Sequence, residues 1–183
     1  MKTYLLVALS AFFAISLLAR EPKPSFPNAI EVGGSELIKR GEYRYVYRLF
    51  FQLYDAALYA PDGASAEDIL SAETDFRLQF RYLREIEKSI ILKSADRMLE
   101  KNLRASERDL IAERVEAINE AYSTVRDGDR SSLTFQRENG TTLRINGDPV
   151  VTIGGDDFAR LYFQIWLGEQ PISKSLKNTL LGD

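Results

Sequence analysis

The chain has 183 residues, of which 45% are hydrophobic and 11% aromatic, and 24 basic against 27 acidic side chains leave a net charge of −3. This composition is typical of a globular protein, and the near-balance of charge argues against duplex nucleic acid as a partner, because phosphate binding needs a basic surface. The sequence contains no histidine and no cysteine, which excludes a Ser-His-Asp triad, a thiol nucleophile, a disulfide and a thiolate zinc site.

The beginning of the chain has the three-part pattern of a secretory signal peptide, residues 1–19. After a short basic start, Tyr4–Ala19 is an uncharged and largely apolar run, and charge returns at Arg20. This run is shorter than the about 20 residues that a membrane-spanning helix needs. We therefore expect cleavage, export to the periplasm or outside the cell, and no stable membrane insertion of the mature chain; an uncleaved anchor is the alternative. Residues 20–28 are predicted to be a flexible lead-in and residues 29–183 a single domain.

The first part of this domain is predicted to consist of strands that end at turns. Gly33-Gly34-Ser35 is a hairpin signal between short apolar stretches. Tyr45–Tyr59 is predicted to be a buried strand pair or one long bent strand, and Ser65 resembles the cap of a short helix. Phe76–Leu83 alternates between apolar and polar residues, which predicts a strand with one buried face, including Phe80.

Two helices and then more strands are predicted in the second half. The first helix extends from about Glu87 to Leu103, and the second begins at a capping-box-like Ser106 and continues through Val125 on one apolar face. Three strands follow within residues 131–153, then a helix that ends at Gly168 and a last amphipathic piece from Pro171. This order of strands, helices, strands and helices predicts an α+β fold.

Three stretches of the sequence resemble the bacterial chalcone isomerase-like proteins. They are Gly41–Pro61, which contains Y-D-A-A-L-Y-A-P, Leu78–Ile86, which contains Y-L-R, and Ile145–Gly168, which contains I-N-G and I-W-L-G. The resemblance covers nearly all of Ala29–Gly182. It implies an open-faced antiparallel sheet packed against a layer of α-helices, with an apolar cleft between the two layers.

The plant enzymes of this superfamily close a flavanone ring, and their catalytic positions match this sequence only in part. The Arg that polarises the substrate falls on Arg44 or Arg48, and the Thr that helps to orient a water falls on Tyr54. The Tyr and Asn of the enzymes fall near Lys88 and Ala95, and neither matches. We therefore predict no measurable chalcone cyclisation and no catalytic residue.

The candidate ligand-binding residues are Arg44, Arg48, Tyr54 and Lys88. On one regular strand, the two arginines and the tyrosine would share a face, where the guanidiniums could hold a carboxylate in an apolar cleft. The alternative is an exposed strand face whose charges keep the protein soluble, and a bulge would break the shared face. Lys88 could act as a base if burial lowered the pKa of its amine, although such a lysine is more often exposed.

No cofactor and no metal ligand is expected. Four acidic residues lie in two short clusters, but their spacing is not that of a calcium loop, and turn or helix-cap positions explain them better. They are Asp127, Asp129, Asp156 and Asp157.

The leading prediction is an exported, non-catalytic binder of a small apolar or amphipathic ligand such as a fatty acid, without nucleic acid as a partner. One alternative is an isomerase or lyase that acts on an enone-like substrate with Arg44 or Arg48 as electrophile. Another is an envelope protein-interaction module, which would have a filled interior.

Overall fold

The computed structural model describes residues 26–48 and 50–182. The predicted signal peptide and residues 20–25 of the predicted lead-in lie outside the described residues. The strands are β1 (Ala29–Val32), β2 (Ser35–Tyr47), β3 (Phe51–Ala60), β4 (Phe76–Tyr82), β5 (Arg130–Gln136), β6 (Gly140–Ile145) and β7 (Asp148–Ile153). The helices are α1 (Ala66–Leu70), α2 (Lys88–Asn102), α3 (Ala105–Ala121), α4 (Asp156–Tyr162), α5 (Gln164–Leu167) and α6 (Lys174–Leu181).

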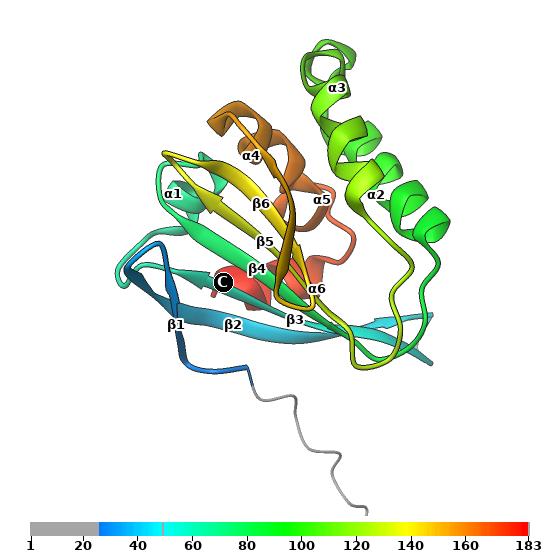
Figure 1. The fold of residues 1–183 in the computed structure, drawn as a ribbon, viewed down its shortest axis with the longest axis horizontal. Helices are drawn as coiled ribbons and strands as arrows, with labels where there is room; N and C mark the ends of the chain where they lie inside the picture. Colours follow the sequence, from blue (N-terminus) through cyan, green and yellow to red (C-terminus); the bar gives the residue numbers. More distant parts are fainter. Residues whose placement is uncertain (1–25, 49, 183) are drawn as a thin grey trace, which may run out of the picture.

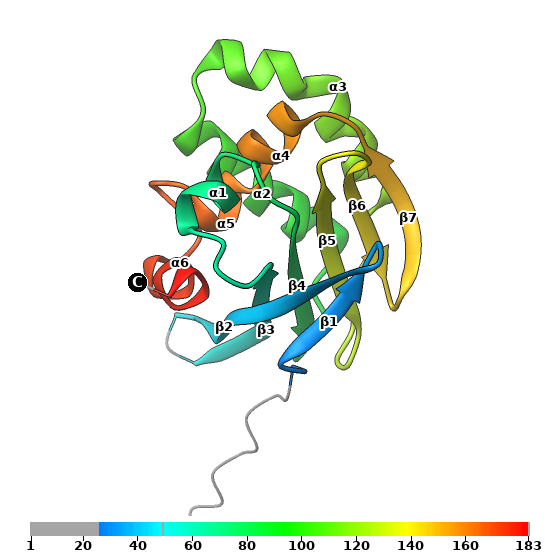
Figure 2. The same cartoon turned by 90° about the vertical axis from the view of Figure 1, so that its left-hand side faces the viewer.

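All seven strands form one antiparallel sheet in which each strand pairs with its neighbour in sequence, in the order β1 to β7. Two-residue turns close the first and last hairpins. Gly33 and Gly34 have φ angles of 58° and 83°, and Asn146 and Gly147 have 51° and 96°. Turns of this kind need positive φ at both central positions, which glycine and asparagine adopt with little strain. The sheet is curled, so that the β1–β2 hairpin lies in front of β4 and β5 in Figure 2.

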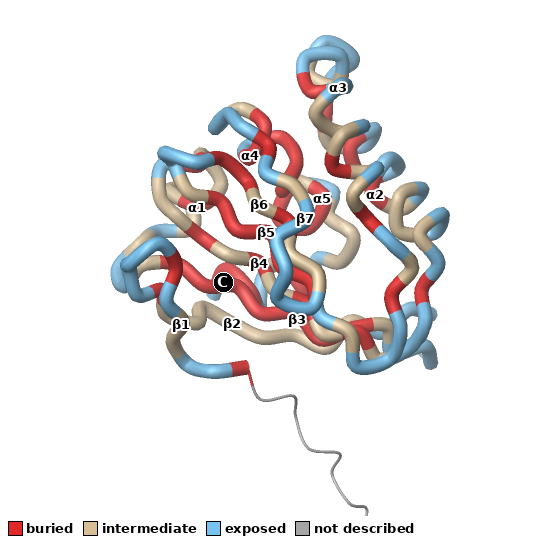
Figure 3. Tube along the Cα trace, in the orientation of Figure 1, coloured by how far each residue is buried: buried red, intermediate tan, exposed pale blue. Residues whose placement is uncertain are grey.

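The helices cover one face of the sheet, and the main core lies between the two layers (Figure 1). In β4, Phe76, Leu78, Phe80 and Tyr82 are buried in strict alternation with partly exposed residues, as predicted. Figure 3 shows this buried layer beneath α4 and α5. The α+β fold is confirmed, with an antiparallel sheet and a helical layer in place of a parallel βαβ arrangement.

Some helix boundaries differ from the predicted ones. The second helix was expected to be capped by Ser106, but the N-cap of α3 lies two residues earlier, at Arg104. Glu107 causes this shift, because its carboxylate accepts a hydrogen bond from the Arg104 backbone N–H at 2.9 Å. The helix also ends before Val125, whose backbone instead pairs with Ile86 in an isolated bridge.

The C-terminal helices are shorter than predicted. The helix expected to continue to Gly168 is divided at Phe163 into α4 and α5. The last helix does not start at Pro171. It starts after Ser173, whose hydroxyl accepts a hydrogen bond from the backbone N–H of Leu176 at 3.2 Å. A serine N-cap satisfies an amide that a proline at this point would leave unpaired.

The opposite face of the sheet has a smaller core under β1. Phe26 is buried there, and the carbonyl of Pro27 accepts a hydrogen bond from the Tyr59 hydroxyl at 2.9 Å. The last residues of the predicted lead-in therefore pack against the sheet. At the other end of the chain, α6 packs so closely on β2 that a Cβ at Gly41 would collide with the Thr179 carbonyl oxygen.

Among the helices that the structure describes, none is both long enough and apolar enough to pass through a bilayer.

Candidate functional site

The two predicted arginines and Tyr54 do not share a face. Tyr45–Tyr59 is a strand pair, the first of the two predicted alternatives, and the chain turns back at Arg48, which has a φ of 49°. In the resulting register Tyr45 lies opposite Tyr54, and Arg44 lies opposite Asp55. Because adjacent strand residues point to opposite faces, Arg44 and Tyr54 lie on different sides of the sheet. The prediction of one shared face is wrong. The register of β2 with β3 shifts by one residue at Leu53, between the Val46–Gln52 and Tyr45–Tyr54 pairs, and such a bulge, the alternative given above, breaks the alternation.

Arg44 pairs with a buried carboxylate. Its Nε lies 2.7 Å from Oδ1 of Asp55, and its Nη2 lies 3.3 Å from Oδ2 of the same residue. Asp55 is completely buried, and a buried carboxylate needs such a partner to remain charged. Arg44 therefore compensates a charge within the protein, on the side of the sheet away from the helices.

Arg48 and Lys88 also lie outside the site that contains Tyr54. Arg48 is exposed at the end of the β2–β3 hairpin, with its guanidinium 5.3 Å from the centre of the Tyr47 ring. The amine of Lys88 donates a hydrogen bond to the Glu120 carbonyl at 3.0 Å, and this residue borders a groove between α2 and α3. Of the four predicted ligand-binding residues, only Tyr54 reaches the interior between sheet and helices.

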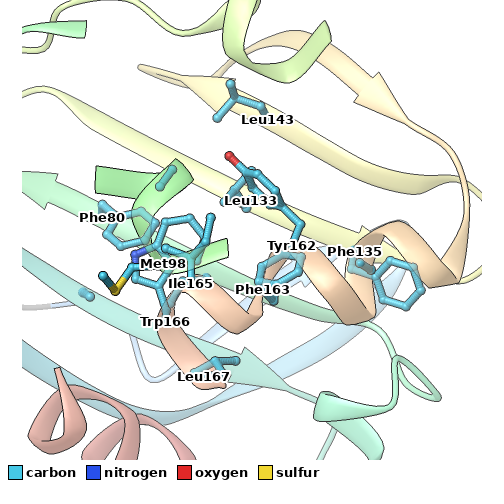
Figure 4. Close-up of a cluster of buried hydrophobic side chains, with 14 of the residues drawn as sticks. Phe80, Met98, Leu133, Phe135, Leu143, Tyr162, Phe163, Ile165, Trp166 and Leu167 are labelled. Carbon is cyan, nitrogen blue, oxygen red and sulfur yellow. The ribbon is translucent and has the colours of Figure 1, made fainter. Parts of the chain in front are cut away.

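Tyr54 lines a narrow apolar cleft of about 100 Å³ between β3 and β4 on one side and α2 and α5 on the other. None of the sixteen described residues that line it is charged. They are Tyr45, Leu53, Tyr54, Phe80, Tyr82, Ile86, Ile90, Ile91, Leu92, Ser94, Ala95, Tyr122, Tyr162, Ile165, Trp166 and Ile172. Figure 4 shows part of its wall, where Phe80 of β4 and Trp166 of α5 lie together, with ring centroids 5.5 Å apart.

The hydroxyl of Tyr54 is the polar group of the cleft that lacks a partner. Tyr54 is 7% exposed, and its Oη makes no hydrogen bond with any described residue. Burial is the main cause that raises its pKa well above the usual value, and the nearby Tyr45 and Tyr82 raise it further. The indole N–H of Trp166 acts in the opposite direction and lowers this pKa.

Three further buried phenols line the same cleft. Tyr82 shares a 3.0 Å hydrogen bond with the Ser131 hydroxyl, and its burial raises its pKa to about 12. Burial also raises the pKa of Tyr122 and of Tyr162, whose hydroxyl groups interact with each other. At neutral pH these phenols are protonated, so they donate hydrogen bonds and do not act as bases.

One wall of the cleft is lightly packed. The side chains of α2 that are buried all lie in its second half, at Ala95, Met98 and Leu99. The first half contributes none, although Ile90 there is a large apolar residue that is 57% exposed. Segments with few buried apolar contacts open at low free energy, so this end of α2 is the wall that can move.

A larger cavity of about 580 Å³ lies on the opposite face of the sheet, where the β1–β2 turn curls toward β5. Its lining is polar and includes Arg77, Arg130 and Arg144. Arg77 donates a 2.7 Å hydrogen bond to the Thr134 hydroxyl, and its pKa is lowered first by burial and then by the charge of Arg144. This groove does not suit an apolar ligand, which needs a mostly apolar wall.

Sequence reasoning missed most of the cleft. Tyr122 lies in the segment predicted as the apolar face of the second helix, and Trp166 lies in the segment predicted as the helix that ends at Gly168. Ala95 did appear at a position matched to the plant enzymes, and it lines the cleft. The aromatic richness of the chain was visible, but which rings converge depends on the register of β3 with β4.

Comparison with known proteins gives findings of two kinds, a family model and similar solved structures. A family model described as chalcone isomerase-like matches residues 23–182. Among solved structures, the chain is similar to a fatty-acid binding protein of Arabidopsis thaliana, with a TM-score of 0.64 and 14% identity over 85% of this chain and 90% of that chain. This likeness confirms the predicted sheet-and-helix fold. No match is found among curated proteins.

Proposed function

The chain belongs to the chalcone isomerase-like family, and from this premise we propose that it binds a small apolar or amphipathic ligand, such as a fatty acid, without catalysis. The observation that carries the proposal is the uncharged, aromatic cleft beneath α2, in which a buried hydroxyl has no partner. Such clefts, apolar with a few polar groups, are typical ligand sites. The structural neighbour described as a fatty-acid binding protein supports this ligand class by analogy.

The cleft must widen to hold its ligand. A volume of about 100 Å³ is close to that of three water molecules, whereas sites for drug-sized ligands have about 300–1,000 Å³. The first half of α2 has no buried side chain, so outward movement there enlarges the cleft at the lowest free energy. We infer that a ligand enters at this end, past Ile90.

The arrangement of residues does not support the isomerase alternative in its predicted form, with Arg44 or Arg48 as electrophile. Isomerisation of an enone needs a donor that stabilises the developing oxyanion, and that role was predicted for Arg44 or Arg48. Arg44 is bound to Asp55 on the other side of the sheet, and Arg48 is exposed at the hairpin end. A protein-interaction module without ligand remains the competing proposal, because it would need only a small cleft.

Trp166 allows a direct test, because it is the single tryptophan of the chain and lines the cleft. Titration with long-chain apolar ligands should change its fluorescence to saturation. Ala95→Phe, which fills the cleft from α2, should remove this response. Ala112→Phe places the same ring at an exposed position of α3 and should leave the response intact. A flat titration of the unmodified protein would favour the interaction module.

We also propose that the protein is exported, since residues 1–19 have the signal-peptide pattern. N-terminal sequencing of the mature protein should begin close to Arg20. An intact Met1 on a soluble mature protein would contradict export by this route.

A further inference from the structure

Resting on the proposed function, we propose that the group which the ligand brings into the cleft is an uncharged hydrogen-bond acceptor, held by the hydroxyl of Tyr54. The ester, aldehyde or ketone carbonyl of a long-chain molecule belongs to this class. A carboxylate does not, although fatty acids in their protonated form do.

The first observation concerns what Tyr54 lacks. Its hydroxyl is buried without a hydrogen-bond partner among the described residues, and a buried donor left unpaired is unfavourable. The polar group that acts on this hydroxyl is the indole N–H of Trp166, which can only donate. The indole can therefore face the oxygen of the phenol but cannot receive its proton. What the cleft is missing is an acceptor.

The second observation concerns charge. The lining of the cleft contains no Arg, Lys, Asp or Glu among the described residues. A carboxylate that entered it would be buried without a compensating cation, which is strongly unfavourable. Arg44, which is adjacent in sequence to Tyr45 of the cleft wall, holds the carboxylate of Asp55 instead.

The third observation concerns the pKa values of the tyrosines that line the cleft. Burial is the largest cause that raises the pKa of Tyr82, Tyr122 and Tyr162, as it is for Tyr54. A raised phenol pKa means that negative charge is disfavoured at that oxygen. A ligand carboxylate placed among these rings would meet the same penalty, whereas a carbonyl oxygen would not.

The test compares decanoic acid, methyl decanoate and decane, with binding followed by the fluorescence of Trp166. Methyl decanoate should bind at least about tenfold more tightly than decanoate at pH 7. The apparent affinity for the acid should fall about tenfold for each pH unit above its pKa of about 4–5, and the affinity for the ester should not depend on pH in this range.

Tyr54→Phe separates the hydrogen bond from the shape of the cleft. It should weaken methyl decanoate binding about three- to tenfold, as the loss of one neutral hydrogen bond predicts, and should not weaken decane binding. Tyr59→Phe is the matched control, because that hydroxyl lies on the other face of the same strand and is bonded to Pro27. It should leave binding of all three ligands unchanged.

The outcomes are distinguishable. Equal binding of acid and ester, with no effect of Tyr54→Phe, would overturn the inference and keep the proposed function. If Arg48→Ala then weakened the acid alone, the carboxylate would lie at the mouth of the cleft. Failure of all three ligands to bind would overturn the proposed function itself and the inference with it.

Discussion

Tyr54→Phe should make the ligand-free protein more stable, which is the reverse of the usual effect of a core substitution. The phenol ring of Tyr54 packs against Phe80 and Tyr45, with ring centroids 5.3 and 5.1 Å apart, and phenylalanine retains these contacts. The substitution removes only a buried hydroxyl without a partner, which costs about 1–3 kcal/mol when left unsatisfied. The nearby indole offsets part of this, so we expect a gain of about 1 kcal/mol in the free energy of unfolding.

Thermal unfolding of the ligand-free variant measures this gain. For a domain of this size, about 1 kcal/mol corresponds to a rise in Tm of about 2–4 °C. Tyr82→Phe is the matched comparison, because its hydroxyl has a buried 3.0 Å hydrogen bond with Ser131. It should lower the free energy of unfolding by about 1–3 kcal/mol, since it leaves the serine unpaired. If both variants lost stability equally, the Tyr54 hydroxyl would have a partner in the free protein and the reasoning would be refuted.

Three other substitutions test the framework around the cleft by urea denaturation. Arg44→Ala should lower the free energy of unfolding by about 3 kcal/mol, because it leaves the buried charge of Asp55 without a partner. Adding Asp55→Ala should restore part of this stability. A single variant as stable as the unmodified protein would contradict the role of Arg44. Gly41→Ala should destabilise by about 1–3 kcal/mol, because its Cβ collides with the backbone of α6, whereas Gly154→Ala meets nothing within 4 Å and should be tolerated. Asp157→Asn should be destabilising at pH 7, because the hydrogen bond from Arg114 lowers the pKa of the Asp157 carboxyl. The stability that this ionised carboxyl contributes is fully present above about pH 4 and is lost as the pH falls through the lower pKa of the folded state. A stability difference that persisted unchanged to the acid limit would contradict that assignment.

The elements that the sequence predicts best are those whose pattern is local. In β4, apolar residues alternate with polar ones, and the buried face follows directly, with Phe80 at 4% exposure. The hairpin at Gly33-Gly34 was predictable because its backbone needs positive φ, which glycine provides. The capping box of α1 was equally local, with Ser65 three residues before Asp68.

The candidate site was harder to predict because it depends on a hairpin without a turn signal and on a register shift within that hairpin. The chain reverses near Arg48, where residues 47–50 contain neither glycine nor proline. A shift of one residue in a strand moves every following side chain to the other face. Such a shift occurs at Leu53, between the Val46–Gln52 and Tyr45–Tyr54 pairs of β2 and β3, and it places Arg44 and Tyr54 on opposite faces.

Three features that lower the stability of the ligand-free protein lie together at the cleft. An unpaired hydroxyl at Tyr54, an exposed Ile90 and a helix end without buried side chains all border the same small volume. A buried hydroxyl without a partner also occurs at Thr141, away from the cleft, but at the cleft three departures from local rules coincide, as is expected of a functional site. A wall that opens at low free energy lets a ligand enter, and the ligand's acceptor then satisfies the hydroxyl that the open state exposes. The same residue thus weakens the empty fold and strengthens the occupied one, so stability and affinity should change in opposite directions when Tyr54 loses its hydroxyl.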